Sequence, residues 1–298
     1  MTSAAPITPV EASRHILEAQ DQGRMVAVVL AAASAGPIVP GSRLLVEQES
    51  RRGTLGHPSA DRRAEELARK ALEGIVRPRE GDAGGVGTDI PGEGLHLLQV
   101  PDLGTDPLEV YLEIYLPRPE LLIVGAGHIA RPLCTLGALL DFRVFVLDDR
   151  PRYATRERFP EAEEVRKVDF GAPFSQHHLG PWSHVVLVTR GHRYDYECLR
   201  HLLRAEPPPS YIGMIGSRRR VRATYVQLQE EGIELHQIRQ VRAPVGLDLG
   251  AETPEEIAVS VAAELVLHRR GGSARPLSQV ERVAERFFRE EPKTEQEG

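Results

Sequence analysis

Residues 120–133 read ELLIVGAGHIARPL, and this stretch decides the fold of the second half of the chain. Its apolar run leads into the spacing Gly-x-Gly-x-x-Ala, formed by Gly125, Gly127 and Ala130. Between a strand and a helix this spacing is typical of a dinucleotide-binding loop, because glycine permits a tight turn and a close approach to phosphate. Such a fold also needs an acidic residue at the end of its second strand, and Asp148, 21 residues after Gly127, meets that requirement.

Residues 118–272 alternate apolar strand patterns with helical patterns. We expect strands at 121–127, 143–149, 165–170, 184–190 and 211–217, and helices at 128–140, 195–205, 218–231 and 253–270. Strands that are apolar throughout and alternate with helices are buried on both faces. The pattern therefore predicts an α/β fold, with a Rossmann-like parallel sheet that carries helices on both faces.

Residues 1–117 predict a smaller α+β domain. A helix is expected at 8–22, because Thr8 and Glu11 form a capping box around Pro9. Further expectations are strands at 25–33, 42–50, 95–100 and 109–116, a turn at 53–56 and a helix from about residue 60. The Gly-rich stretch 77–94 is interpreted as a loop or linker, and residues 273–298 as a charged tail with one helix at 278–289.

Composition narrows the class of protein. The 298 residues are 41% hydrophobic and 27% charged, which is typical of a soluble globular chain. A net charge of −6 and 5% aromatic residues argue against a general nucleic-acid binder. The longest apolar run, residues 25–33, is too short for a membrane span, and the first residues lack a secretory pattern. Two unpaired cysteines, Cys134 and Cys198, fit a reducing cytoplasm.

Polar residues follow the first and fourth strands of the expected sheet. His128 comes directly after the second loop glycine, and Thr189, His192 and Asp195 share the loop after residue 188. Ligands bind at the carboxyl ends of strands in open α/β sheets, so these four side chains are candidate ligand contacts. The alternatives are a solvent-exposed helix start for His128 and a structural role for His192.

The stretch GMIGSRRR ends the fifth strand and opens a helix. Gly216 and Ser217 form the turn, and Arg218 and Arg219 follow in the first helical turn, together with Arg220. Cations at this end of a helix oppose its dipole, and a bound anion would explain them. The alternative is a solvated basic face.

A third loop, APVGLDLGAETPEEIA at 243–258, feeds the last helix. Gly246, Asp248 and Glu252 could close the site or hold a metal ion. Capping of the helix accounts for Thr253 and Glu256 without any ligand. The chain contains no Ser/His/Asp elbow, HExxH or CxxC pattern, so the sequence favours binding over catalysis.

Taken together, four segments resemble the C-terminal Rossmann domain of the XdhC/CoxI family, the xanthine dehydrogenase accessory proteins. They are VGAGHIARPL at 124–133, VTRGHRYDYECLRHLL at 188–203, YIGMIGSRRRV at 211–221 and APVGLDLGAETPEEIAVSVAAELV at 243–266. The N-terminal half is similar to the smaller domain of that family through residues 26–47 and 53–72.

The resemblance implies a maturation chaperone rather than an enzyme. Such a protein binds molybdenum cofactor (molybdopterin) and assists its sulfuration and insertion into a molybdenum hydroxylase. It also implies a homodimer and contact with a cysteine desulfurase. Two alternatives from other classes stay open: an NAD(P)-dependent oxidoreductase with His192 as its proton donor, and a non-catalytic nucleotide sensor.

The chain departs from the family pattern in its N-terminal half. Residues 53–61 read GTLGHPSAD where many members read something like GTIGGGCLE, so that His57, Pro58 and Ser59 replace glycines and a cysteine. The stretch GPIVPGS at 36–42 replaces the usual PRPxGA. These departures predict that a thiol-dependent step is lost.

Overall fold

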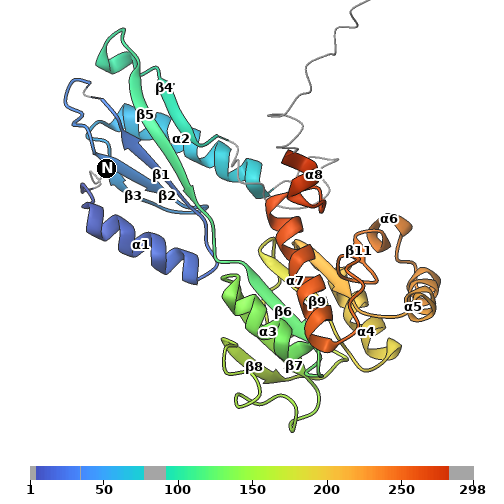
Figure 1. The fold of residues 1–298 in the computed structure, drawn as a ribbon. Coiled ribbons are helices and arrows are strands. Elements are labelled where there is room, and N and C mark those ends of the chain that lie inside the picture. The colour runs from blue at the N-terminus through green and yellow to red at the C-terminus, as the bar shows by residue number, and fades with distance from the viewer. Residues whose placement is uncertain (1–4, 34, 77–91, 282–298) are drawn as a thin grey trace, which may run out of the picture.

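The computed structural model describes residues 5–33, 35–76 and 92–281. The chain forms two units, each built around its own sheet, as Figure 1 shows. The first unit carries an antiparallel sheet and the second a parallel one. This arrangement confirms the predicted α/β class.

The N-terminal unit is a five-stranded sheet of order β3-β2-β1-β5-β4, with one helix on each face. Its elements are α1 (Pro9–Asp21), β1 (Val26–Ala31), β2 (Arg43–Val46), β3 (Arg51–Thr54), α2 (Pro58–Val76), β4 (Gly94–Leu98), the 3-10 turn η1 (Pro101–Leu103) and β5 (Leu108–Tyr115). Helix α1 begins as predicted, with the Thr8 side chain accepting from the Glu11 amide and the Glu11 side chain accepting from the Thr8 amide.

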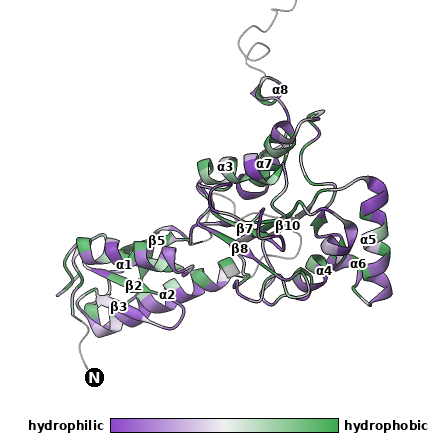
Figure 2. Ribbon diagram, turned by 90° about the horizontal axis from the view of Figure 1, so that it is seen from below, coloured by the Kyte–Doolittle hydropathy of each residue, from purple (hydrophilic) through white to green (hydrophobic). Residues whose placement is uncertain are grey.

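Alternation along β1 produces the two cores of this unit. Ala27 and Val29 face α2, and Val26 and Val28 face α1. Helix α2 contributes a row of small buried side chains at helical spacing: Ala60, Ala64 and Ala68. Both helices carry hydrophilic and hydrophobic faces in Figure 2, as expected for helices that cover a sheet on one side only.

The C-terminal unit is a six-stranded parallel sheet of order β11-β10-β9-β6-β7-β8. Its strands are β6 (Glu120–Val124), β7 (Arg143–Asp148), β8 (Glu164–Lys167), β9 (Ser183–Leu187), β10 (Tyr211–Met214) and β11 (Val241–Arg242). Its helices are α3 (Ala130–Leu139), α4 (His192–Leu202), α5 (Arg218–Glu230), α6 (Leu235–Ile238), α7 (Pro254–Arg270) and α8 (Leu277–Glu281). This is the doubly wound order of a Rossmann fold, and its switch point lies between β6 and β9.

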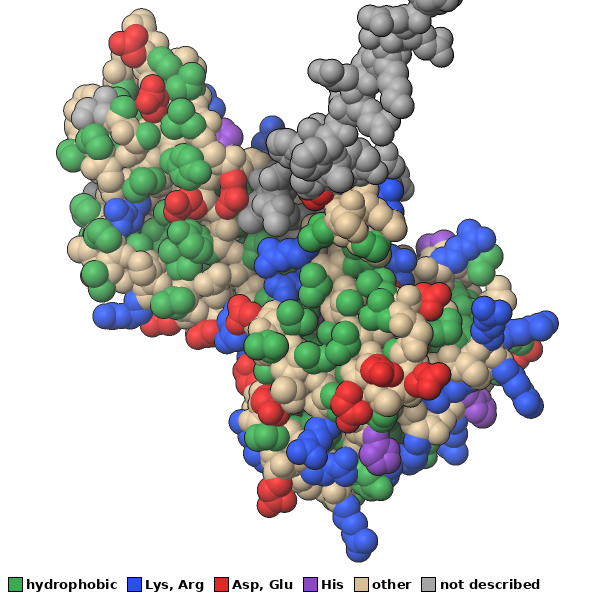
Figure 3. All heavy atoms as spheres, in the orientation of Figure 1, with side chains coloured by type: hydrophobic (Ala, Val, Ile, Leu, Met, Phe, Trp, Pro, Cys, Tyr) green, Lys and Arg blue, Asp and Glu red, His purple; other side chains and the backbone are tan. Residues whose placement is uncertain are grey.

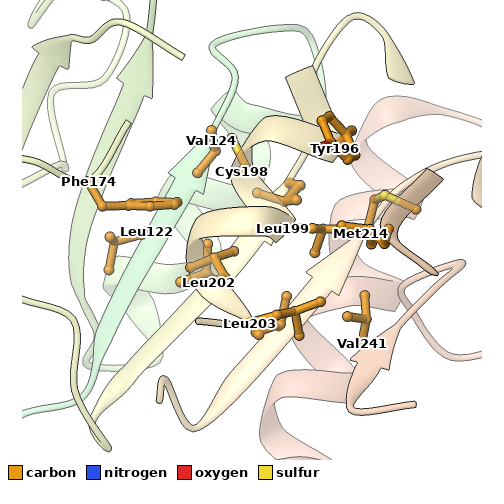
Figure 4. Close-up of a cluster of buried hydrophobic side chains, with 14 of the residues drawn as sticks. Leu122, Val124, Phe174, Tyr196, Cys198, Leu199, Leu202, Leu203, Met214 and Val241 are labelled. Carbon is orange, nitrogen blue, oxygen red and sulfur yellow. The ribbon is translucent and has the colours of Figure 1, made fainter. Parts of the chain in front are cut away.

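Helices cover both faces of the parallel sheet, as predicted. Leu122 and Val124 of β6 pack with side chains of α4 and α5, and Figure 4 shows Leu199 and Leu202 of α4 pointing toward the strands. The alternate residues Leu121 and Ile123 pack on the other face, with α3 and α7. The strands are therefore buried on both sides, which explains their continuous apolar runs.

Several elements differ from the sequence-based expectation. Residues 53 and 54, expected in a turn at 53–56, belong to strand β3, which pairs with β2. Helix α4 begins at His192, three residues before the expected start. The short elements α6 and β11 lie in a segment with no strong periodicity, and β11 pairs with β10 through only two residues. Most of the predicted linker at 77–94 and of the helix at 278–289 falls outside the described residues.

Charged side chains are scattered among other side chains on the face of the molecule in Figure 3. Figure 3 shows Lys and Arg side chains around the C-terminal unit, including a group at the right edge, where Figure 1 places α5. Among the helices of the described residues, none combines the length and the apolar character that crossing a membrane requires.

Candidate functional site

The switch point of the sheet is formed by the turn after β6 and the loop after β9. Gly125 has a φ of 109°, and a Cβ atom at this position would lie 2.6 Å from the Val188 carbonyl oxygen. The turn therefore requires glycine, because any side chain would collide with the backbone of the neighbouring strand. A Cβ on Gly127 would meet nothing within 4 Å, so the space above the second glycine is open. Ala130 is buried at the start of α3.

Two helices that start at the switch point have no side-chain cap. Helix α3 begins after Ile129 and α4 after Gly191, and neither of these residues accepts a hydrogen bond through a side chain. By contrast, Ser217 and Thr253 cap α5 and α7. Both helix starts lie at the edge where a Rossmann fold binds phosphate. In α4 the Tyr194 amide donates to the Gly191 carbonyl at 3.0 Å, which leaves the two amides before it without a side-chain cap.

Asp148 occupies the expected position at the end of β7, but its carboxylate is fully engaged inside the protein. Oδ2 accepts from the Ala126 amide at 2.7 Å and from the Arg150 guanidinium at 2.9 Å. Oδ1 accepts from the amide and the Nε of Arg150 at 2.8 and 2.9 Å. Burial acts to raise the pKa of Asp148, but the hydrogen bonds from Arg150 and Ala126 outweigh it and lower the pKa to about 2.

Thr189 and Asp195 belong to a buried network around Arg220. The Thr189 hydroxyl donates to Oδ1 of Asp195 at 2.6 Å, and Arg220 Nε donates to Oδ2 at 2.6 Å. Arg220 also donates to the Thr189 carbonyl at 3.1 Å. Asp195 is fully buried, and burial raises its pKa to about 6 against the opposing effects of Thr189 and Arg220. This network ties β9, α4 and α5 together.

The arginine run of α5 therefore divides into two kinds of residue. Arg220 points inward, with its side chain against Gly216 and its guanidinium on Asp195. Arg218 and Arg219 are exposed. Within the described residues neither has an ion-pair partner. They lie beyond the carboxyl end of β10, which pairs with β9 on the side away from the switch point.

The two histidines predicted at the site are also exposed. His128 lies in the turn before α3, and His192 is the first residue of α4. Neither side chain has a hydrogen-bond partner among the described residues. Together with Arg218 and Arg219, they give the carboxyl edge of the sheet four polar side chains without internal partners.

The loop after β11 is held by hydrogen bonds to helix α7. Gly246 has a φ of 109°, and a Cβ there would lie 2.4 Å from the Ser260 hydroxyl. The Gly246 amide donates to Glu264. Asp248 and Glu252 are exposed. Among the described residues no group of three or more His, Cys, Asp or Glu side chains is arranged to hold a metal ion.

One ion pair at this edge was missed by sequence reasoning. Arg190 and Asp149 are 41 residues apart, and the two guanidinium nitrogens donate to the two carboxylate oxygens at 2.6 and 2.7 Å. Each residue follows a strand that flanks β6, because Asp149 comes after β7 and Arg190 lies just beyond β9. The sequence feature that could have predicted this pair is that each residue directly follows one of the two strands that flank β6.

The two stretches that depart from the family pattern lie side by side in the N-terminal unit. A Cβ on Gly56 would be 3.5 Å from the Pro37 carbonyl. Asp61 organises the first loop, accepting from the Leu55 amide and the Thr54 hydroxyl at 2.6 Å each. The Ser59 hydroxyl donates to Asp102. Both cysteines of the chain belong to the C-terminal unit and are buried there.

This combination of strand order, glycine turn and uncapped helices defines the C-terminal unit as a Rossmann-type domain with an anion-compatible edge. Residues 121–265 match the family described as the XdhC Rossmann domain. This match assigns the C-terminal unit to that family and confirms the resemblance seen in the sequence.

Two curated proteins share this region. Uncharacterized protein YqeB of Escherichia coli (strain K12) is 35% identical over 160 residues, which are 53% of this chain and 29% of that protein. A probable xanthine dehydrogenase subunit of Bacillus subtilis (strain 168) is 34% identical over 154 residues, 52% of this chain and 44% of that protein. The matched region thus spans less than half of each relative.

A solved structure, described as a xanthine dehydrogenase from Bacillus halodurans, resembles the whole fold. The TM-score is 0.56 at 24% identity, and the match covers 92% of this chain and 68% of that chain. At this identity the likeness supports the two-unit architecture alone.

Proposed function

We propose that this protein is an accessory factor for a molybdenum hydroxylase, and that it binds molybdenum cofactor as cargo at the switch point of its Rossmann domain. The family assignment and the name of the Bacillus subtilis relative support this role. A chaperone needs a binding edge but no catalytic set, in keeping with the motifs of this chain.

The observation that carries the proposal is the set of unpartnered anion-binding groups at the carboxyl edge. Molybdopterin bears a phosphate, which suits the uncapped amides of α3 and α4. Arg218 or Arg219 would supply a charge-assisted hydrogen bond, and His128 and His192 lie on the two helix starts. The residues present therefore fit a phosphate-bearing ligand.

Asp148 argues against the rival function of an oxidoreductase that uses NAD. In NAD-dependent enzymes the acidic residue at this position accepts a hydrogen bond from the ribose. Here Ala126 and Arg150 already use both carboxylate oxygens. NAD would have to displace Arg150 from a buried carboxylate, at the cost of uncompensated charge.

The remaining partners follow from the same proposal. We expect a homodimer in the cytoplasm that meets its client hydroxylase and a cysteine desulfurase. Because the N-terminal unit has no cysteine, any sulfur would be carried by the desulfurase and not by this chain.

Two assays on the purified protein test the proposal. Molybdenum cofactor should bind the parent and bind Arg218→Ala or Arg219→Ala more weakly, since a charged contact is removed. NADH and NADPH should show no steady oxidation with simple carbonyl substrates. Steady oxidation that is lost in His192→Ala would contradict the proposal and favour the oxidoreductase.

A further inference from the structure

The Arg190–Asp149 ion pair spans the strand that carries the glycine turn. Strands β7 and β9 both pair with β6, and the two residues lie beyond the carboxyl ends of β7 and β9. The pair therefore bridges the edge of the sheet across the end of β6. This is where a phosphate-bearing ligand must pass to reach the turn at Gly125.

Arg190 is held in place without Asp149. Its guanidinium lies over the ring of Tyr194, 4.1 Å from the ring centroid, and donates to the Tyr194 hydroxyl at 2.5 Å. Tyr194 is itself packed against Phe170, with a centroid distance of 4.8 Å. Because Tyr194 of α4, itself packed on Phe170, positions the guanidinium, removal of Asp149 would leave Arg190 in the same place.

Asp149 is held much less firmly. Within the described residues its side chain has no hydrogen-bond or ion-pair partner other than Arg190. The side chains of Arg190 and Asp149 are 36% and 28% exposed, so solvent screens the pair and reaches both groups. An incoming anion therefore competes with a carboxylate that is accessible and has no second partner among the described residues.

The chemistry of the pair matches that of a phosphate contact. A carboxylate that accepts two parallel hydrogen bonds from one guanidinium presents the same fork that a phosphate group uses. Asp149 thus stands in for two phosphate oxygens, beside the uncapped start of α4. Arg190 was absent from the site predicted from the sequence.

We propose that Arg190 is the phosphate-anchoring residue of the switch point, and that Asp149 occupies it as an internal competitor until a phosphate-bearing ligand displaces the carboxylate. This inference rests on the proposed function, because it requires that the edge binds phosphate. The inference adds Arg190 to the binding residues and predicts that Asp149 lowers the apparent affinity of the protein for a phosphate-bearing ligand.

The test is a double-mutant cycle with inorganic pyrophosphate as the probe, measured by calorimetry at low ionic strength. Asp149→Asn should tighten binding about fivefold, the change expected if the pair is closed in about four-fifths of the molecules. Arg190→Gln should weaken binding by a factor of about 10 or more, because a charged hydrogen bond is lost. In the Arg190→Gln background, Asp149→Asn should have little effect.

A matched control is available in the same domain. Arg118 and Asp141 form an exposed ion pair of 2.9 Å, and Asp141 has a φ of 64°, which asparagine tolerates well. Asp141→Asn removes the same charge and should leave pyrophosphate binding unchanged. Thermal unfolding of each variant checks that the domain is intact.

The outcomes separate the two proposals. If the parent binds pyrophosphate and Asp149→Asn binds it equally or more weakly, the competitor role is wrong and the phosphate site stands. If Asp149→Asn tightens binding equally in the Arg190→Gln background, the inference is also overturned. The tightening would then come from the loss of a negative charge near the site and not from the release of Arg190. If neither the parent nor any variant binds, the phosphate site itself fails, and this inference fails with it.

Discussion

The carboxylate of Asp148 accepts a hydrogen bond from the Ala126 amide at 2.7 Å, which ties the end of β7 to the glycine turn that follows β6. The contact joins two residues 22 positions apart through a side chain with 1% exposure. The sequence predicted Asp148 as a cofactor-binding residue because of its place at the end of the second strand. In the structure this carboxylate stabilises the turn that follows β6.

Stability should fall in acid through Asp148. Its pKa is lowered to about 2 from an ordinary value of 3.8, so its contribution is fully present above pH 4 and is lost as the pH falls toward 2. The shift corresponds to about 2 kcal/mol in the free energy of unfolding. Urea titrations of the parent and Asp148→Asn should differ by roughly that amount at pH 6 and converge near pH 2. A difference that does not change with pH would contradict this assignment.

Removal of Arg220 should destabilise the protein far more than removal of its neighbours. Arg220→Ala leaves Asp195 as a buried carboxylate without a charged partner, which costs roughly 3 to 5 kcal/mol. The loss should be larger at pH 8 than at pH 5, because protonation of Asp195 relieves the buried charge at the lower pH. Denaturant unfolding of Arg220→Ala, with Arg219→Ala as the control from the same run, measures the difference. Equal losses for the two variants would show that the inward and outward arginines are not distinct.

The two exposed arginines should instead affect binding. Arg218→Ala and Arg219→Ala should leave the unfolding free energy unchanged or slightly raised, since both cations oppose the dipole of α5. The variant that removes the ligand-facing side chain should weaken binding of pyrophosphate by about 1.5 to 3 kcal/mol. Calorimetry on the two single variants decides which residue that is. Parent-like affinity in both would show that this pair is a solvated basic face.

Both cysteines should resist alkylation in the folded protein. Burial raises the pKa of Cys134 to about 12 and that of Cys198 well above its ordinary range. At pH 8 the thiolate fraction of Cys134 is then roughly 10³-fold smaller than that of a free thiol. Mass spectrometry after iodoacetamide treatment should show labelling only when urea is present. Rapid labelling of the native protein, with loss of ligand binding, would contradict the prediction that a thiol-dependent step is lost.

The sequence predicted the elements whose signals are local. Capping boxes at Thr8 and Thr253 marked the starts of α1 and α7, and the Gly-x-Gly-x-x-Ala spacing marked the turn at Gly125 between a strand and a helix. Strand β3 was not foreseen, because its residues RRGT form a strand only by pairing with β2. The two-residue strand β11 likewise depends on its neighbour β10.

The internal partners of the site residues could not be read from the sequence. The phase of α5 turns Arg220 toward Asp195 and leaves Arg218 and Arg219 in solvent, and the run RRRV contains no signal that distinguishes them. Arg190 and Asp149 meet only because the strands before them flank β6. Such contacts depend on the strand order and on the direction of each side chain. A sequence pattern implies the strand order, but it does not give the directions of the side chains.

The most direct test of the central claim is to identify the ligand that leaves the protein. The protein should be purified under conditions that preserve bound cofactor and then denatured, and the released molecules analysed by mass spectrometry, with molybdenum measured in parallel. The account predicts a phosphate-bearing pterin, present in the parent and depleted when Arg190 or the ligand-facing arginine of α5 is replaced. Release of NAD(H) or NADP(H) in near-stoichiometric amount, without pterin or molybdenum, would contradict it.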